Sequence, residues 1–117
     1  MTHRLFSAAL VLLALTACVS DPPPLEQLRL SEQAVSQARA VGADEQVPEL
    51  AQAEDKLRQA QAAMADEAFK QARVLAEQAE LDARLAEARV LTAKSQEQLA
   101  ELSKRINRLR HQLGDLQ

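Results

Sequence analysis

The sequence is poor in the residues that build aromatic, redox and metal sites. It contains no tryptophan or tyrosine, two phenylalanines, two histidines and one cysteine. A single cysteine excludes a disulfide within the chain. So few aromatic side chains leave no stacking platform for sugars or bases, which argues against a lectin, a single-strand binder and a nucleic-acid partner.

Patterns for catalysis are also missing. His111 is the only histidine beyond the first 17 residues, and it lacks the second histidine or nearby cysteine of a zinc site. The serines stand singly, and Gly42 and Gly114 form no nucleophile elbow. The many carboxylates resemble solvated helix faces rather than a desolvated acid/base pair. We expect no enzyme activity, no metal, no cofactor and no small-molecule substrate.

What the chain does have is alanine. Apolar residues make up 47% of it, yet alanine supplies much of that share, and the formal net charge is only −3. Burial stabilises by roughly 25 cal/mol per Å² of apolar surface, so an alanine core gives close helix packing and a modest total. At this length we expect one small domain.

The first residues are typical of a signal peptide. A polar start with Arg4 precedes the apolar run 5–15, which is shorter than the roughly 20 residues that span a bilayer. The run ends in a sequence that resembles a lipobox: Leu15, Thr16, Ala17 and Cys18. We expect residues 1–17 to be removed and Cys18 to carry a covalent diacylglycerol. The alternative is an ordinary secretory signal followed by a chance cysteine.

The residues after Cys18 predict an address and a spacer. Lipoproteins with Asp directly after the cysteine tend to stay in the inner membrane, whereas this chain has Val19 and Ser20. We therefore expect a protein of the cell envelope that faces the periplasm, anchored in the inner leaflet of the outer membrane rather than in the inner membrane. Residues 18–24 end in three prolines, which favour an extended polyproline II tether.

From residue 25 the apolar spacing is helical, and it predicts an all-α fold. A first helix over 25–41, with apolar positions Leu28, Ala34, Val35 and Ala38, ends at Gly42. Pro48 suits the first turn of a second helix, and Asp66 is a candidate N-cap for a third. Their apolar stripes are Leu50, Ala53, Leu57, Ala60 and Met64, then Phe69, Ala72, Ala76, Ala79, Ala83, Ala86, Val90 and Ala93. We expect an antiparallel hairpin packed on a long third helix, with the alanine-rich three-helix domain covering 25–94.

Two stretches of this region, 48–60 and 69–86, carry a resemblance to a known family. They read PELAQAEDKLRQA and FKQARVLAEQAELDARLA. Residues 28–94 resemble the domain-of-unknown-function 4398 (DUF4398) family of bacterial lipoproteins, and the resemblance implies a helical, alanine-rich module behind a lipobox. The sequence departs from the family at Ala65 and Asp66, where glycine often marks the turn, and at Phe69, where tyrosine is frequent.

The segment 95–117 has the a/d spacing of a coiled coil. Its large aliphatic positions are Leu99, Leu102, Ile106, Leu109, Leu113 and Leu116. A helix over 67–116 would be about 75 Å long against about 25 Å for each of the first two, so this leucine-heptad segment either meets a partner helix or folds back near Thr92 or Ser95. The partner would be a second copy or another helical envelope protein.

Charges beside the heptads limit the choice of partner. With Leu99 at position a, Arg105 occupies g and Arg110 occupies e, so these arginines meet in a parallel in-register dimer. An antiparallel pair, a trimer, or a different helix with acidic flanks avoids this repulsion.

The same segment carries a basic cluster, Lys104, Arg105, Arg108 and Arg110. It either contacts peptidoglycan or lipopolysaccharide or simply complements the helix dipole. We expect a non-enzymatic, lipid-anchored interaction module that acts through coiled-coil contacts. The alternatives are a noncovalent envelope-ligand binder and an accessory enzyme or inhibitor acting on a wall hydrolase.

Overall fold

The computed structural model describes residues 21–114. This part of the chain holds three helices and no strand: α2 (Leu25–Ala40), α3 (Pro48–Ala65) and α4 (Phe69–Gly114). The expected all-α fold is therefore confirmed. The predicted signal peptide, the lipobox with Cys18, and Leu116 lie outside the described residues.

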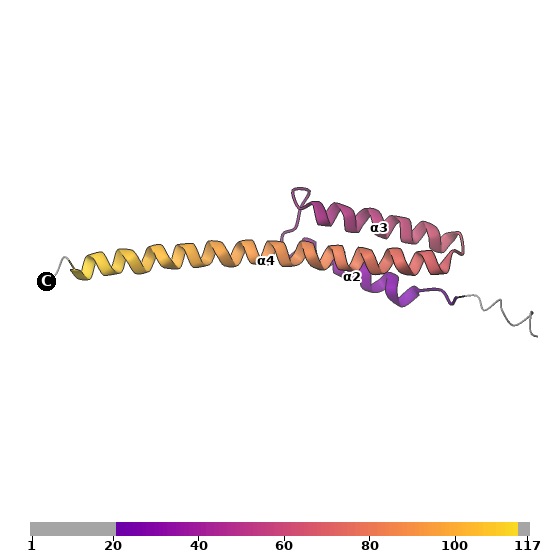
Figure 1. The fold of residues 1–117 in the computed structure, drawn as a ribbon, viewed down its shortest axis with the longest axis horizontal. Coiled ribbons are helices and arrows are strands. Elements are labelled where there is room, and N and C mark those ends of the chain that lie inside the picture. Colours follow the sequence, from indigo (N-terminus) through magenta and orange to yellow (C-terminus); the bar gives the residue numbers. More distant parts are fainter. Residues whose placement is uncertain (1–20, 115–117) are drawn as a thin grey trace, which may run out of the picture.

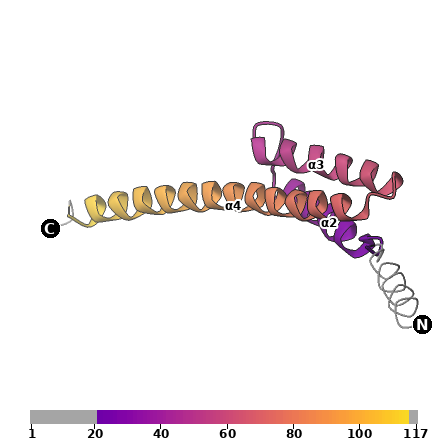
Figure 2. The ribbon, with the colours of Figure 1, turned by 45° about the vertical axis from the view of Figure 1, so that its right-hand side comes forward.

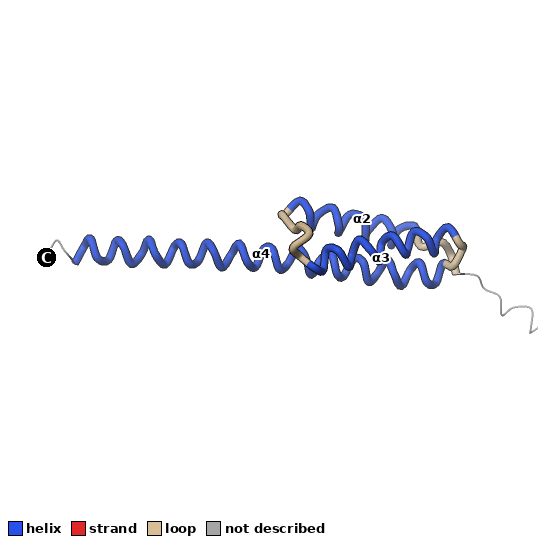
Figure 3. The backbone as a smooth tube through the Cα atoms, turned by 90° about the horizontal axis from the view of Figure 1, so that it is seen from above, coloured by secondary structure: helices blue, strands red, loops and turns tan. Residues whose placement is uncertain are grey.

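The three helices form a short bundle from which one helix projects. α2 and α3 both lie along the first half of α4, and the rest of α4 continues alone (Figures 1 and 2). Seen from above, α4 runs on as one helix past the loop between α2 and α3 (Figure 3). The fold-back at Thr92 or Ser95 is wrong for this structure, because both residues lie inside the single 46-residue helix.

Backbone geometry explains where α2 ends. Gly42 has φ of +102°, a conformation that glycine adopts without the steric cost of a Cβ. The amide of Ala43 donates to the carbonyl oxygen of Ala38 at 2.9 Å, which is the bond that closes a Schellman motif. Lys94 of α4 adds a further cap, because its Nζ donates to the Val41 carbonyl oxygen at 2.6 Å.

The turn between α3 and α4 differs from the prediction. Asp66 is the C-cap of α3 rather than the N-cap of α4, which begins at Phe69. Glu67 then takes φ of +58°, and the amide of Ala68 donates to the carbonyl oxygen of Ala63 at 2.8 Å. This is again a Schellman closure, with a glutamate in the left-handed position that usually holds glycine.

Alanine makes the seam between the helices. On α4, every alanine of the seam is fully buried: Ala72, Ala76, Ala79, Ala83 and Ala86. Ala38 of α2 and Ala53 and Ala60 of α3 are buried against this face. Small side chains let helix axes approach closely, which explains why the core needs so few large residues. Ala93, predicted for the same stripe, is exposed, because it lies one turn beyond Arg89, where the start of α3 meets α4.

Polar contacts join α4 to each neighbour along the edges of the seam. Gln27 of α2 donates to Glu80 at 2.7 Å, and Lys56 of α3 donates to Asp82 at 2.6 Å. These bonds lie on either side of the alanine face. They fix α2 and α3 as the two flanks of α4 and leave the opposite side of α4 uncovered.

One acidic side chain at the start of α3 is buried. Glu49 lies in the first turn of its helix, where the helix dipole favours a negative charge. Its Oε1 forms an ion pair with Nη2 of Arg89 of α4 at 2.9 Å, while its Oε2 is buried without a hydrogen-bond partner. The ion pair therefore ties the start of α3 to α4 at one corner of the bundle.

Candidate functional site

The predicted partner surface is an exposed strip on the projecting half of α4. Every residue from 91 to 114 is exposed. Five large aliphatic side chains share one side of this segment, with exposed fractions from 41% for Ile106 to 66% for Leu113. We call them the leucine strip: Leu99, Leu102, Ile106, Leu109 and Leu113.

The strip extends further back along α4 than the sequence analysis found. Leu81 and Leu85 are 66% and 48% exposed although they lie beside the bundle. Leu81 and Leu99 are 18 residues apart, which is about five full turns at 3.6 residues per turn, so they point in the same direction. The leucine strip together with Leu81 and Leu85 is called the outer face of α4.

The outer face and the alanine seam are opposite sides of one helix. Ala79 and Ala83 are each two residues from Leu81, and two residues correspond to about 200° around a helix. The a/d spacing that places Leu99 and Leu102 in one heptad also contains Leu85 and Leu81. This signal was present in the sequence, but the alanine stripe on the same helix concealed it.

Between the leucines of the bundle and the leucine strip, the outer face has small residues. Ala88, Thr92 and Ser95 occupy the heptad positions there. A solvent-open hollow of about 440 Å³ lies at this place, with Leu85, Ala88 and Thr92 in its lining. Ser95 donates through Oγ to the carbonyl oxygen of Leu91 at 2.9 Å, so its hydroxyl is satisfied within its own helix.

The predicted basic cluster does not form a pocket. Lys104 and Arg108 are one helical turn apart on the side away from the leucines, whereas Arg110 lies beside the leucine strip. Arg105 pairs with Glu101 through its Nε at 3.1 Å. The four side chains thus point in several directions from a single exposed helix.

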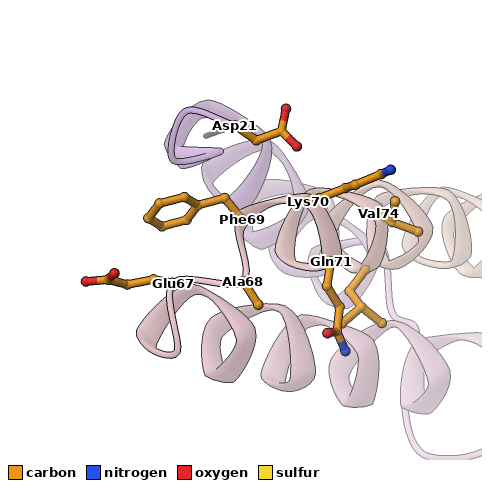
Figure 4. A pocket seen from close by; sticks show the side chains of 8 residues that line it. Asp21, Glu67, Ala68, Phe69, Lys70, Gln71 and Val74 are labelled. Atoms are coloured by element: carbon orange, nitrogen blue, oxygen red, sulfur yellow. The ribbon is translucent and has the colours of Figure 1, made fainter. Parts of the chain in front are cut away.

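A second hollow lies at the end of the bundle where α4 begins. It is open to solvent, has a volume of about 770 Å³, and is lined on its apolar side by Phe69, Val74 and Leu75. Asp21 and Lys70 lie at its edge (Figure 4). Because Asp21 precedes α2 and Phe69 begins α4, the tether and the start of α4 are at the same end of the molecule.

Among residues 21–114, no group of three histidine, cysteine, aspartate or glutamate side chains is arranged to hold a metal ion. The helices described here include none that is both long enough and apolar enough to cross a membrane.

Fold and surface together define an elongated all-helical protein with a small bundle and a projecting helix. The chain belongs to the DUF4398 family, whose model, described as a domain of unknown function, matches residues 26–102. It is also similar to a DUF4398 family protein from Pseudomonas aeruginosa PAO1 known from a crystal structure. That likeness has 61% sequence identity and a TM-score of 0.79, and covers 82% of this chain and 100% of that one. No curated protein matches the chain.

The resemblance read from residues 28–94 is therefore confirmed, and the family match reaches eight residues further, from 94 to 102. It takes in Leu99 and Leu102, the first two positions of the leucine strip. The family description names no activity or ligand.

Proposed function

We propose that this protein is a non-enzymatic, lipid-anchored periplasmic module that acts by binding another helix along α4. The observation that carries the proposal is the leucine strip, five large aliphatic side chains left exposed on a continuous helix. Exposed apolar strips of this kind generally mark interaction surfaces. The a/d spacing fits a helix as the partner.

The length of the projecting segment supports this proposal. Helices in proteins gain most of their stability from packing an apolar face against a neighbour rather than from intrinsic propensity. The segment 95–114 packs on neither α2 nor α3, since all its residues are exposed. A partner helix on the leucine strip would supply the missing packing.

The anchor enters the proposal through Cys18 and the position of the tether. Burying acyl chains contributes about 0.8 kcal/mol per CH₂, so several chains hold a protein firmly to a bilayer. Residues 21–24 lead into α2 at the end of the bundle where α4 begins. An anchored protein would then carry its leucine strip away from the tether, in position to bridge to a partner some tens of ångströms off.

A direct test of the interaction uses photo-crosslinking in cells that make the full chain. A crosslinking amino acid replaces Leu102 or Leu109 in the leucine strip, and Lys104 or Arg108 serves as the matched position on the other side of the same turns. We expect defined adducts, with a helical protein or with a second copy, from the strip positions alone. Equal adducts from both sides, or adducts with peptidoglycan only, would overturn the helix-binding proposal and favour the envelope-ligand alternative.

Binding to purified peptidoglycan sacculi is tested with two variants. Arg105→Glu/Arg108→Glu reverses charge in the basic cluster, whereas Leu102→Asp/Leu109→Asp disrupts the strip. Under our proposal, any retention on sacculi is unchanged by the arginine reversal. Loss of sacculus binding in the arginine variant alone would make the basic cluster the functional surface.

The anchor is tested separately. Metabolic labelling with an alkyne fatty acid should mark the wild-type chain and not Cys18→Ser. Equal labelling of Cys18→Ser would show that this cysteine does not carry the lipid.

A further inference from the structure

We propose that the occupant of the outer face is a second copy of this chain, bound antiparallel to the first with the two α4 helices crossing level with Glu97. This inference rests on the proposed helix-binding function and names its partner. It uses the whole outer face, including Leu81 and Leu85, rather than the leucine strip alone. Two independent features lead to this arrangement, the flanking charges and the sizes of the core residues, and the hollow beside Thr92 marks where the small residues lie.

Flanking charges disfavour the parallel in-register pair. In that arrangement each g position faces the e position five residues later on the other copy. Over the outer face this brings Glu77 to Asp82, Arg84 to Arg89 and Arg105 to Arg110. All three contacts join like charges, and each occurs twice in a symmetric dimer. Like-charge pairs at such positions are destabilising.

The charges also select one antiparallel register. In antiparallel pairs, e positions face e positions and g positions face g positions. With the centre at Glu97, Arg110 of one copy faces Asp82 of the other, and no two e or g positions bring like charges together. Sliding the copies by one heptad brings together Arg84 and Arg105 in one direction, or Arg89 and Arg110 in the other. Asp82 already binds Lys56 through Oδ2, and a carboxylate has a second oxygen to accept from Arg110.

The same register matches large residues to small ones. The small heptad residues Ala88, Thr92 and Ser95 of one copy then face large residues of the other. The layers of the interface pair Leu81 with Leu113, Leu85 with Leu109, Ala88 with Ile106, Thr92 with Leu102, and Ser95 with Leu99. Every layer contains a large aliphatic side chain. A parallel in-register pair would instead face Thr92 with Thr92 and Ser95 with Ser95, which leaves the middle of the interface poorly filled.

The hollow on the outer face lies where this register needs space. Its lining includes Leu85, Ala88 and Thr92, the positions that face Leu109, Ile106 and Leu102 of the second copy. The hollow is open to solvent, and the small residues Ala88 and Thr92 in its lining leave room for the large side chains that face them. α2 and α3 do not obstruct the approach, because they pack on the alanine seam on the opposite side of α4.

The experiment measures distances between copies with spin labels. Residues 19–117 contain no cysteine, and the Pseudomonas relative, whose whole chain matches 82% of this one, shows that a body of this extent folds. Gln98→Cys and Gln112→Cys each supply one label. Both residues are glutamines at position g, two heptads apart, so their lateral geometry is the same and each serves as the control for the other.

The antiparallel pair predicts very different distances at the two positions. The labels at 98 lie about 3 Å apart along the helix axis, and those at 112 about 45 Å apart, from the 1.5 Å rise per residue. We expect a dimer by light scattering, a dipolar-broadened spectrum at 98, and a long pulsed-resonance distance at 112. Leu102→Asp/Leu109→Asp in either labelled chain should abolish the coupling and give a monomer.

Other outcomes overturn the proposal in distinct ways. Equal distances at 98 and 112 would show a parallel pair, which refutes the antiparallel register and leaves the helix-binding function standing. A monomer at every concentration, with no coupling at 98, would refute a second copy as the occupant. The crosslinks from Leu102 and Leu109 in cells would then decide whether a different helix binds there or the helix-binding function itself fails.

Discussion

Enlarging one alanine in the seam should test how the bundle is held together. Ala53 of α3 is fully buried and shares its cluster with Ala83 and Ala86 of α4. Ala53→Leu adds three carbon atoms at this contact. If the seam had room, their burial would stabilise the fold by about 2 kcal/mol, at ~0.8 kcal/mol per carbon. Closely packed backbones leave no such room, and overpacking typically costs about 1–3 kcal/mol.

We therefore expect Ala53→Leu to lower the free energy of unfolding by about 2 kcal/mol, a large part of the 5–15 kcal/mol typical of a domain. Ala51→Leu is the matched control, because Ala51 lies on the same helix two residues away and is exposed. Its effect should stay within about 0.5 kcal/mol.

Urea unfolding followed by far-ultraviolet circular dichroism gives both values. The measurements belong in the Leu102→Asp/Leu109→Asp background, because association would make the apparent stability depend on concentration. Equal stability of the two leucine variants, or a more stable Ala53→Leu, would refute the conclusion that α3 packs closely on α4.

Three further changes should alter stability in predictable directions in the same assay. Glu67→Gly should stabilise by about 0.5–1 kcal/mol, because φ of +58° at this residue strains a side chain and suits glycine; destabilisation would contradict the strain. Arg89→Ala should destabilise by about 1 kcal/mol, since it leaves the buried Glu49 carboxylate unpaired. The control Arg58→Ala removes an exposed pair with Asp55 and should cost no more than about 0.5 kcal/mol. Similar losses in the two variants would argue against a role for burial. Deleting the residues after Lys94 should leave the unfolding free energy within about 0.5 kcal/mol of the parent, because residues 95–114 are exposed, and a larger loss would show that the overhang supports the bundle.

The ion pair at the start of α2 illustrates how little an exposed pair contributes to the stability of this protein. Arg29 donates to Glu26 at 2.6 Å, and this hydrogen bond holds the pKa of the Glu26 carboxyl below its ordinary value. Because the pKa of Glu26 is lower in the folded state, its carboxylate contributes to the free energy of unfolding above the pKa of the unfolded chain, and this contribution is lost as pH falls. Both side chains are exposed, where solvent screens the pair.

Helical periodicity was enough to predict the three helices and their order. Gly42 and Pro48 marked the end of one helix and the start of the next, because their backbone preferences are local. The turn after α3 was mistaken because Asp66 suits an N-cap and the left-handed position is held by Glu67, a residue that gives no such signal. How far the buried seam runs along α4 depends on where the neighbouring helices lie, and Ala93 was therefore wrongly assigned to it.

The leucines at 81 and 85 were missed for a related reason. A helix that is apolar on two opposite sides has no single apolar stripe. The regular alanine stripe of α4 therefore concealed the heptad pattern to which Leu81 and Leu85 belong. Burial separates the two, since the alanines from 72 to 86 are fully buried while Leu81 and Leu85 are exposed.

This division of residues between the two sides of α4 follows from the partners they meet. Within the chain, α2 and α3 approach α4 closely, and at such a distance only small side chains fit between the backbones. A heptad interface holds its helices further apart and needs large side chains to fill the space. Leucine on the seam would push the bundle open, and alanine on the outer face would give a partner too little to bury. One helix can therefore hold its own domain together and present a surface to a second molecule, provided the two residue sizes stay on opposite sides.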